Sequence, residues 1–584
     1  MFPQPARILP NERAPSRLAD VLVLGIGLTL FTFVLSAARN WLGPQSPTAE
    51  ISRHPSALPI YAAYSVLRLG VAYAISLVFA LAYGYAAAHN KKAEKILIPM
   101  LDILQSIPVL SFLPGVMLAM AALFPSTQIG IELGSILLIF TGQVWNIAFS
   151  FYSSLNSIPR ELYEAARVNR FSRWQQFTQL ELPYSTIGVV WNSMMSVAGG
   201  WFFLMVCEMF PLGDRQVRLP GLGSYIQTAA YEGDIRAILW GLGAMVAVIV
   251  LLDQLVWRPA IAWSDKFKFE QVESAAAPQS AVLNLLRRSR AIDYIGSKAI
   301  SPLAERCVRF FSAKGMPAID SGSPARKTNW LGRLTMAALV AAALYGIIRA
   351  AMIMANLTTL DLAEIGRGAG ATFLRVSVSL LIGAAWTIPV GVWVGFNPRV
   401  LRFAAPLAQI AASIPATGLF PVVLLVLMRF QMVHPGDGLG LTSVLLMLLG
   451  TQWYILFNVI AGATAIPTDL KEAAAIFRFG RWDRWRLLIL PGIFPYLITG
   501  LVTAAGGAWN ASIVAEYIPF QEKVLYTTGL GATISRASSE ASTTGNFSLL
   551  LAATVAMALM VVIVNRNVWR RLYRLAETRF KLET

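Results

Sequence analysis

The sequence predicts an all-α, polytopic membrane protein made of two repeated halves. Hydrophobic residues make up 56% of the 584 positions and charged residues only 14%. Several apolar runs are longer than the roughly 20 residues that cross a bilayer as a helix. The chain also repeats itself, because Glu164 and Pro183 recur as Glu472 and Pro491, both 308 positions later. A long repeat at a constant offset indicates two homologous halves in one polypeptide.

About twelve membrane-spanning helices are expected, six in each half. Apolar runs place those of the first half at 20–42, 60–88, 97–123, 128–155, 184–212 and 236–257. Those of the second half fall at 329–356, 366–395, 401–429, 440–465, 492–519 and 546–565. Because six is an even number, both halves enter the membrane in the same orientation. This predicts parallel repeats related by an axis along the membrane normal.

The basic residues predict the orientation of the chain. The formal net charge is +17, and 35 of the 48 Lys and Arg fall in segments that lie inside if the N-terminus is inside. This bias predicts that both termini and both repeated loops are cytoplasmic. Membrane topology and contact with anionic lipid explain the basic composition better than a nucleic-acid partner does.

Three segments follow from this organisation. Residues 1–257 form the first half, 258–328 a basic cytoplasmic linker and 329–584 the second half. Within the linker, 274–280 is expected to be a flexible joint, and 281–311 an amphipathic helix on the bilayer surface. So short a segment buries too little core to suggest a regulatory domain.

Each half carries a polar loop between its fourth and fifth spans, at 157–183 and 465–491. In the first loop Pro159 suits the first turn of a helix, and Ser172 suits the cap of a second, short helix. The expected product is a helix–turn–helix that projects from the membrane, with an Ala-Ala step where another protein approaches closely. A helix pair that only anchors the loop is the alternative, which two copies on the same face disfavour. The matched residues are Glu164, Ala165, Ala166, Leu182 and Pro183, and Glu472, Ala473, Ala474, Leu490 and Pro491.

These loops resemble the Glu-Ala-Ala coupling loop of ABC importer permeases, and the flanking segments resemble the nitrate, sulfonate, taurine and bicarbonate permease group. The resemblance covers nearly all of both halves except the first span of each and the linker. It implies a type I importer fold, two cytoplasmic ATPase subunits docked on the two loops, and an extracytoplasmic substrate-binding protein on the opposite face. ATP and Mg²⁺ would then be bound by those partners, and this chain would hold no cofactor or metal of its own.

One position departs from the family pattern. The family glycine of the loop falls at Arg170 and at Arg478. Glycine would permit a left-handed turn between the two short helices, which arginine adopts only at a cost. Either a tighter helical turn or a bend at Ser172 and Gly480 is therefore expected.

Four ionisable residues lie at membrane depth, as two matched pairs: Arg68 with Glu208, and Arg375 with Glu516. Such residues face the interior of the bundle, because exposure to lipid is costly. The arginines could bind an oxyanion through their bidentate guanidinium groups. Alternatively each Arg pairs with its Glu as a structural bridge, an interpretation that the equal and opposite charges favour.

Further candidates for the translocation path are prolines and tryptophans of the spans. Pro108 and Pro415, within repeated Ser-Ile-Pro segments, are expected to break or kink the third span of each half. Broken helices at membrane depth line a cavity or meet neighbouring protein. Trp201 and Trp509 would gate the path or simply pack between helices.

The chemistry that is missing excludes most enzymes. The chain has no Gly-rich phosphate loop of the GxxxxGK[ST] kind, and its three His and two Cys show no metal-ligand spacing. The sequence thus favours an importer permease for a small solute, with an oxyanion expected from the resemblance. A secondary transporter with two parallel halves and a membrane scaffold without transport are the alternatives.

Overall fold

The computed structural model describes residues 17–41, 43, 50–212, 215–267, 280–290, 294, 297, 298, 302, 306, 330–429, 440–520 and 523–579. Helices occupy all twelve expected positions. Within these residues eight helices are long and apolar enough to cross a membrane by length and composition. The prediction of an all-α polytopic protein is therefore confirmed.

The first half is built from six spans in chain order. They are α1 (Arg17–Trp41), α2 (Leu58–His89), the broken pair α3 (Lys91–Ser106) and α4 (Leu113–Leu123), then α5 (Ile129–Asn156), α8 (Leu182–Cys207) and α10 (Ile235–Leu252). Short helices α6 (Arg160–Val168) and α7 (Arg173–Gln176) form the first loop, and α9 (Leu222–Tyr231) precedes α10. α11 (Arg258–Ser264) extends the last span, and α12 (Ala281–Arg287) follows in the linker.

The second half repeats this order. Its spans are α15 (Trp330–Met354), α16 (Thr359–Phe396), the broken pair α17 (Pro398–Ser413) and α18 (Ala416–Arg429), then α19 (Gly440–Ala465), α22 (Leu490–Ala515) and α24 (Ser548–Val564). Helices α20 (Thr468–Ile476) and α21 (Arg481–Asp483) form the second loop. α23 (Leu530–Thr544) precedes α24, and α25 (Arg570–Arg579) follows it.

The fifth span of each half is shorter than predicted. The expected spans 184–212 and 492–519 end at Cys207 and Ala515, and a two-stranded antiparallel hairpin follows each. The strands are β1 (Met209–Leu212) with β2 (Arg215–Arg218), and β3 (Tyr517–Phe520) with β4 (Lys523–Tyr526). The hairpins read as apolar continuations of the helices because side chains such as Phe210 and Val217 are buried against neighbouring helices.

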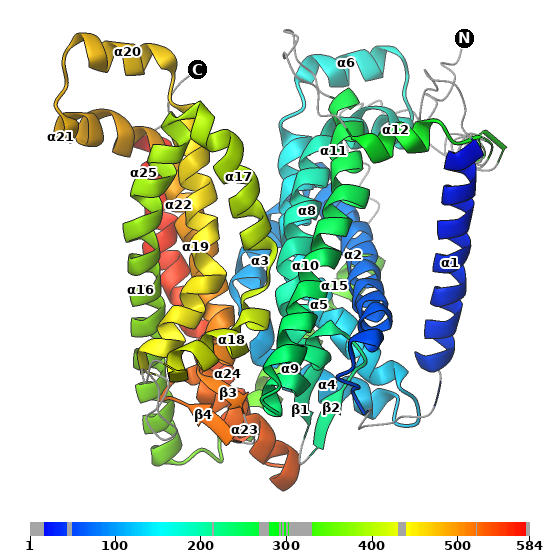
Figure 1. Ribbon diagram of the computed structural model, residues 1–584, viewed down its shortest axis with the longest axis vertical. Coiled ribbons are helices and arrows are strands. Elements are labelled where there is room, and N and C mark those ends of the chain that lie inside the picture. Colours follow the sequence, from blue (N-terminus) through cyan, green and yellow to red (C-terminus); the bar gives the residue numbers. More distant parts are fainter. Residues whose placement is uncertain are drawn as a thin grey trace.

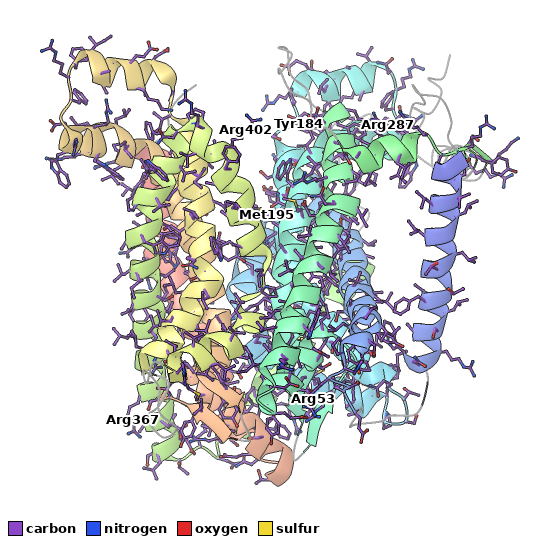
Figure 2. The ribbon with its side chains drawn as sticks, in the orientation of Figure 1. Arg53, Tyr184, Met195, Arg287, Arg367 and Arg402 are labelled. Carbon is purple, nitrogen blue, oxygen red and sulfur yellow. The ribbon has the colours of Figure 1, made fainter. Side chains whose placement is uncertain are left out.

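The two ends of the bundle differ. We call the end that holds α6 and α20 the loop end, and the end that holds the four strands the hairpin end (Figure 1). Both loops lie at the same end, as parallel repeats require. Arg402 lies near the loop end, whereas Arg53 and Arg367 lie near the hairpin end (Figure 2).

The broken third spans join the two halves. The break falls at Ile107–Pro108 in the first half and at Ile414–Pro415 in the second, because proline removes a helical hydrogen bond donor. α18 packs against α8, α9 and α10 of the first half. Symmetrically, α3 and the 3₁₀ turn Val109–Phe112 pack against α24, and that turn also packs against α22. The breaks therefore meet neighbouring protein, in this case the opposite half.

The largest apolar cluster is shared by the two halves, whereas the smaller clusters are not. The large cluster contains buried side chains of both halves, including Tyr225 and Phe420, and extends from the hairpin end along α10 and α24 as far as Leu252 and Val561. Near the loop end the smaller clusters within the described residues each belong to one half. Those of the first half include Val144 and Phe151, and those of the second include Val394 and Val459. The halves are thus joined through the large cluster, whereas the smaller clusters beneath each loop belong to one half.

The linker is described only in part. α12 begins within the amphipathic segment expected at 281–311, and Ser280 caps it by accepting from the backbone N–H of Leu283. The Oγ of Ser289 donates to Asp20 of α1 at 2.8 Å. The flexible joint expected at 274–280 lies outside the described residues except for Ser280, as does most of the linker beyond 290.

Candidate functional site

The first loop is a helix–turn–helix, as predicted. Pro159 is the N-cap of α6, and Ser172 caps α7 in a capping box with Gln175. Such a box satisfies two backbone donors that the helix start leaves free. Residues Phe177–Glu181 form a π-helical turn that leads into α8, with Pro183 in its first turn. The second loop repeats these elements with Pro467 and Gly480 as caps.

The turn between the two short helices is left-handed. Arg170 and Arg478 have φ angles of 52° and 50°. In the first loop the N–H of Arg170 donates to Arg167 O (2.9 Å) and that of Phe171 to Ala166 O (3.0 Å), and the second loop repeats both bonds. This is a Schellman ending, which favours glycine at the left-handed position. Our expectation of a tighter helical turn, or of a bend at Ser172 and Gly480, is therefore wrong: the arginines adopt the glycine conformation.

The Glu-Ala-Ala residues split between an exposed and a buried face. Glu164 and Glu472 are exposed, whereas Ala166 and Ala474 are buried. A helix with this pattern keeps its carboxylate free for a partner. The small buried alanines let the helix lie close to the elements below it.

A buried carboxylate anchors the first loop, and the sequence analysis missed it. Glu181 Oε1 accepts from Gln176 Nε2 at 2.8 Å and from the Tyr163 hydroxyl at 3.4 Å, and lies 2.9 Å from Nε2 of His89 at the end of α2. Burial, reinforced by the Glu181 charge, raises the pKa of Tyr163, so its hydroxyl stays protonated as a donor. We call these four residues the Glu181 hub. Its signal was a lone acidic residue directly before the Leu-Pro that begins a span.

The second loop has no such hub, because its matching positions carry other chemistry. At the offset of 308, Glu181 becomes Ile489, Tyr163 becomes Lys471 and Gln176 becomes Arg484. Lys471 instead lies over the ring of Phe396, 4.8 Å from its centroid. Ile476, Phe477 and Trp482 of the second loop are also about three-quarters exposed. The two loops thus share a backbone but present different surfaces.

The intramembrane charges of the first half form a closed network. Arg68 is fully buried and binds Glu132 through Nε (2.5 Å) and Nη2 (2.8 Å), while its Nη1 donates to Glu208 Oε1 at 2.8 Å. Ser65 Oγ and the N–H of Gly223 also donate to Glu208, at 2.6 and 2.7 Å. Arg68 and Glu208 therefore form an ion pair, as the structural-bridge interpretation expects. Glu132, an acid near the start of an apolar span, escaped the sequence analysis.

The second half builds the same network with one carboxylate fewer. Arg375 Nη1 donates to Glu516 Oε1 at 2.9 Å, and Thr372 Oγ1 takes the place of Ser65 Oγ. The N–H of Gly531 donates to Glu516 Oε2 at 2.9 Å. The position that matches Glu132 is Gly440, so Arg375 has a single acidic partner within the described residues.

The repeated Gly-Leu-Gly segments fit tightly around these carboxylates. A Cβ at Gly221 would lie 2.2 Å from Oε2 of Glu208, and one at Gly529 would lie about as close to Glu516. Glycine is needed here for space, since both residues have extended backbone. The network therefore locks the end of the fifth span to the start of α9 or α23.

The remaining candidates for the translocation path lie inside the protein. Trp201 and Trp509 are each 2% exposed and belong to the shared core. Pro108 and Pro415 are buried at the breaks of the third spans. The structure brings the prolines to the interface between the halves, whereas the two ion-pair networks lie within their own halves.

Comparison with known proteins gives this architecture a family. A family model described as "Binding-protein-dependent transport system inner membrane component" matches residues 76–256 and again 387–571. The two matches correspond to the two repeats.

Individual relatives are similar over one part of the chain. The nitrate import permease protein NrtB of Leptolyngbya laminosa is 26% identical over 148 residues, which are 25% of this chain and 50% of that protein. The bicarbonate transport system permease protein CmpB of Synechococcus elongatus is 30% identical over the same shares. The taurine transport system permease protein TauC of Escherichia coli is 26% identical over 29% of this chain and 55% of its own length. The chain thus spans about half the length of these relatives.

The family model covers more than half of the chain, in two copies that coincide with the repeated helices and loops. The chain therefore belongs to the family of binding-protein-dependent transport system inner membrane components, as a fused permease of two halves.

Proposed function

We propose that this chain is the membrane-spanning subunit of an ATP-driven importer and forms the path of a small solute between its two halves. Two cytoplasmic ATPase subunits dock on the loops 157–183 and 465–491, and an extracytoplasmic substrate-binding protein docks at the hairpin end. ATP and Mg²⁺ belong to the ATPases. The chain performs no covalent chemistry, and both its termini and the linker 258–328 lie on the cytoplasmic side of the inner membrane.

One observation carries this proposal: two exposed Glu-Ala-Ala helices stand on separately packed halves at the same end of the bundle (Figure 1). Because the apolar clusters beneath the two loops each belong to one half, force applied to the two loops can close the loop end without breaking either half. Closure there would open the opposite side, which is the requirement for alternating access.

The solute class follows from the relatives and from the charges. We propose a small oxyanion such as nitrate, sulfonate, taurine or bicarbonate, since the similar permeases are named for nitrate, bicarbonate and taurine. Pro108, Trp201, Pro415 and Trp509 are the proposed path residues that lie in or beside the interface of the halves. Arg68 and Arg375, with Glu208 and Glu516, act on the path by holding the ends of its helices in place.

The test is uptake into liposomes that contain the chain, its ATPases and its binding protein. A ligand screen on the binding protein first identifies the solute, and uptake is then measured with and without ATP. We expect uptake of an oxyanion that requires ATP. Uptake without any ATPase subunit would instead indicate a secondary transporter, and the absence of flux with all partners present would indicate a scaffold. Uptake confined to sugars, peptides or metal cations would reject the oxyanion but leave the importer.

A further inference from the structure

The last membrane helix ends in a groove lined by arginines. α24 continues through a π-helical turn, Asn565–Trp569, into α25 at the loop end. The groove beside this turn is shallow and open, with a volume of about 520 Å³; its lining belongs to this one helix and includes Arg566, Arg570, Arg571 and Arg574 over Val562 and Ile563. Arg566, Arg570 and Arg574 are spaced four residues apart and so share one side of the helix.

None of these four arginines has a carboxylate partner among the side chains that the structure describes. All four are exposed, and the ion pairs of the described residues join other groups. Like charges four residues apart on a helix destabilise it. A groove that gathers four such charges therefore favours an anion from outside the protein.

The first half shows that the fold itself does not require this groove. Its last span has the same π-helical turn at Asp253–Trp257, and Val256-Trp257-Arg258 matches Val568-Trp569-Arg570. There Arg258 is neutralised, since its Nε lies 3.0 Å from Oδ2 of Asp253.

The second half lacks this aspartate and has three additional arginines. Asn565 stands where the first half has Asp253. Arginine replaces Gln254, Pro259 and Ala262 at the positions of Arg566, Arg571 and Arg574. The change from one paired arginine to four clustered ones is specific to this half and leaves the helix geometry unaltered.

The surroundings of the groove indicate the kind of anion. Its floor is the end of an apolar span, and Ile563 is 56% exposed. The groove thus lies where the hydrocarbon of a bilayer gives way to headgroups, at the end that carries most of the basic residues. Guanidinium groups bind phosphate oxygens bidentately, and basic pockets at the cytoplasmic ends of membrane helices bind anionic headgroups.

We propose that this arginine groove binds the phosphate headgroup of an anionic phospholipid, whose acyl chains lie along Val562 and Ile563. The bound lipid reinforces one side of the molecule only. α25 packs on α22, the span that begins at Leu490-Pro491 of the second loop. The lipid therefore braces the base of the second loop, and the first loop has no equivalent.

The test compares lipid retention by two sets of variants of the full chain. The first set is Arg566→Gln, Arg570→Gln and Arg574→Gln together. The matched control is Arg258→Gln, Arg399→Gln and Arg402→Gln together, which removes three exposed arginines of α11 and α17 but leaves the groove intact. Each protein is equilibrated with equal amounts of phosphatidylglycerol and phosphatidylcholine, and bound lipid is measured by native mass spectrometry.

We expect the wild type and the control to retain phosphatidylglycerol in preference to phosphatidylcholine. Each neutralised arginine of the groove should weaken binding about fivefold, and the triple change on the order of 100-fold. Arginine-to-lysine changes at the same three positions should restore part of the binding, which shows that the variants are folded. Equal retention by the groove variant would overturn the proposal. So would equal binding of the two lipids, displacement of the lipid by millimolar inorganic phosphate, or loss of an ATPase subunit from the groove variant while the lipid stays bound.

Discussion

Arg170 and Arg478 hold a backbone conformation that residues with a side chain seldom adopt. Each ends a helix in a left-handed turn that both Schellman hydrogen bonds require. The left-handed conformation costs an L-residue roughly 1–2 kcal/mol. Both halves keep this strain at the same place, beside the helix that we propose to dock the ATPase.

Replacing either arginine by glycine should therefore stabilise its loop. We expect Arg170→Gly and Arg478→Gly each to raise the free energy of local opening by about 1 kcal/mol. The substitution removes the backbone strain, and the greater flexibility of glycine in the opened loop offsets part of this gain. Hydrogen exchange of the amides of Ala166–Phe171 measures this. Arg167→Gly, inside α6, is the control and should accelerate exchange. Faster exchange in Arg170→Gly would show that the arginine side chain, not the backbone, holds the turn.

The two ion-pair networks make a second prediction at this scale. Glu516→Gln leaves Arg375 without a carboxylate among the described residues, whereas Glu208→Gln leaves Arg68 paired with Glu132. An unpaired buried charge costs roughly 3–5 kcal/mol, so Glu516→Gln should lower the melting temperature in detergent more than Glu208→Gln does. The double change Arg375→Met with Glu516→Met should recover part of the loss, whereas Arg68→Met with Glu208→Met should not, because it leaves Glu132 buried without its cation. Strictly additive losses would contradict pairing and restore the arginines as ligands of the solute.

Sequence reasoning succeeded with these residues where a repeat supplied a match. Arg68, Glu208 and their counterparts stood out because opposite charges recur at one offset. Glu132 and Glu181 were missed because each occurs in only one half, so no second copy marked them. The conformation of Arg170 was predicted wrongly. Arginine has a low propensity for the left-handed conformation, but the hydrogen bonds at the end of the helix require it.

The elements that distinguish this fold most are the loop helices α6 and α20. They have the same caps and the same turn, and both keep a glutamate exposed. Their positions at one end follow from six spans per half, which the sequence predicted. The hairpins were not predicted, because the short apolar strands continue the hydrophobic run of the preceding helix.

Removing the exposed glutamates should uncouple the protein from its ATPase. We expect Glu164→Ala and Glu472→Ala each to weaken ATPase co-purification, and the double change to abolish transport while the melting temperature stays unchanged. The effects of the single changes should differ, because Tyr163 precedes one glutamate and Lys471 the other. Normal transport by the double variant would refute the docking role of these helices.

The Glu181 hub should matter for the transmission of force rather than for docking. Glu181→Ile, which copies the second half, removes three polar contacts that join the π-helical turn before α8 to α2, α6 and α7. Unpaired buried polar groups cost about 1–3 kcal/mol, so the first loop should move independently of its spans. The ATPase should still co-purify, but less solute should be imported for each ATP hydrolysed. Glu181→Gln should retain most of the coupling, and Ile489→Val is the matched control.

At the scale of the whole molecule, the halves depend on one another near the hairpin end. The broken third spans cross to the opposite half, and the core there contains side chains of both. Near the loop end each half has its own core. This arrangement lets the hairpin end act as a hinge while the loop ends of the two halves move relative to each other.

Separately expressed halves should therefore assemble with each other. We expect a fragment of residues 1–290 and a tagged fragment of residues 329–584 to co-purify when they are made in the same cell. Each alone should be degraded, because its part of the shared core is exposed. Gly418→Leu should weaken the association, since a Cβ at Gly418 already lies 2.9 Å from Met245 of the other half. Gly346→Leu, with no neighbour within 4 Å, is the control. Stable single halves would contradict a shared core.

Gly440 occupies the position in the second half that Glu132 occupies in the first. This difference makes the buried charge of the two halves unequal. In a permease assembled from two identical chains every substitution appears twice, so the two sides of the path stay identical. A covalently joined pair is free of that constraint, and this chain uses the freedom: one side contains an arginine between two acids, the other an arginine with one. Among the described residues, the formal charge of the first network is therefore one unit more negative than that of the second. If the two halves flank the path as we propose, a solute between them therefore has unequal buried charge on its two sides.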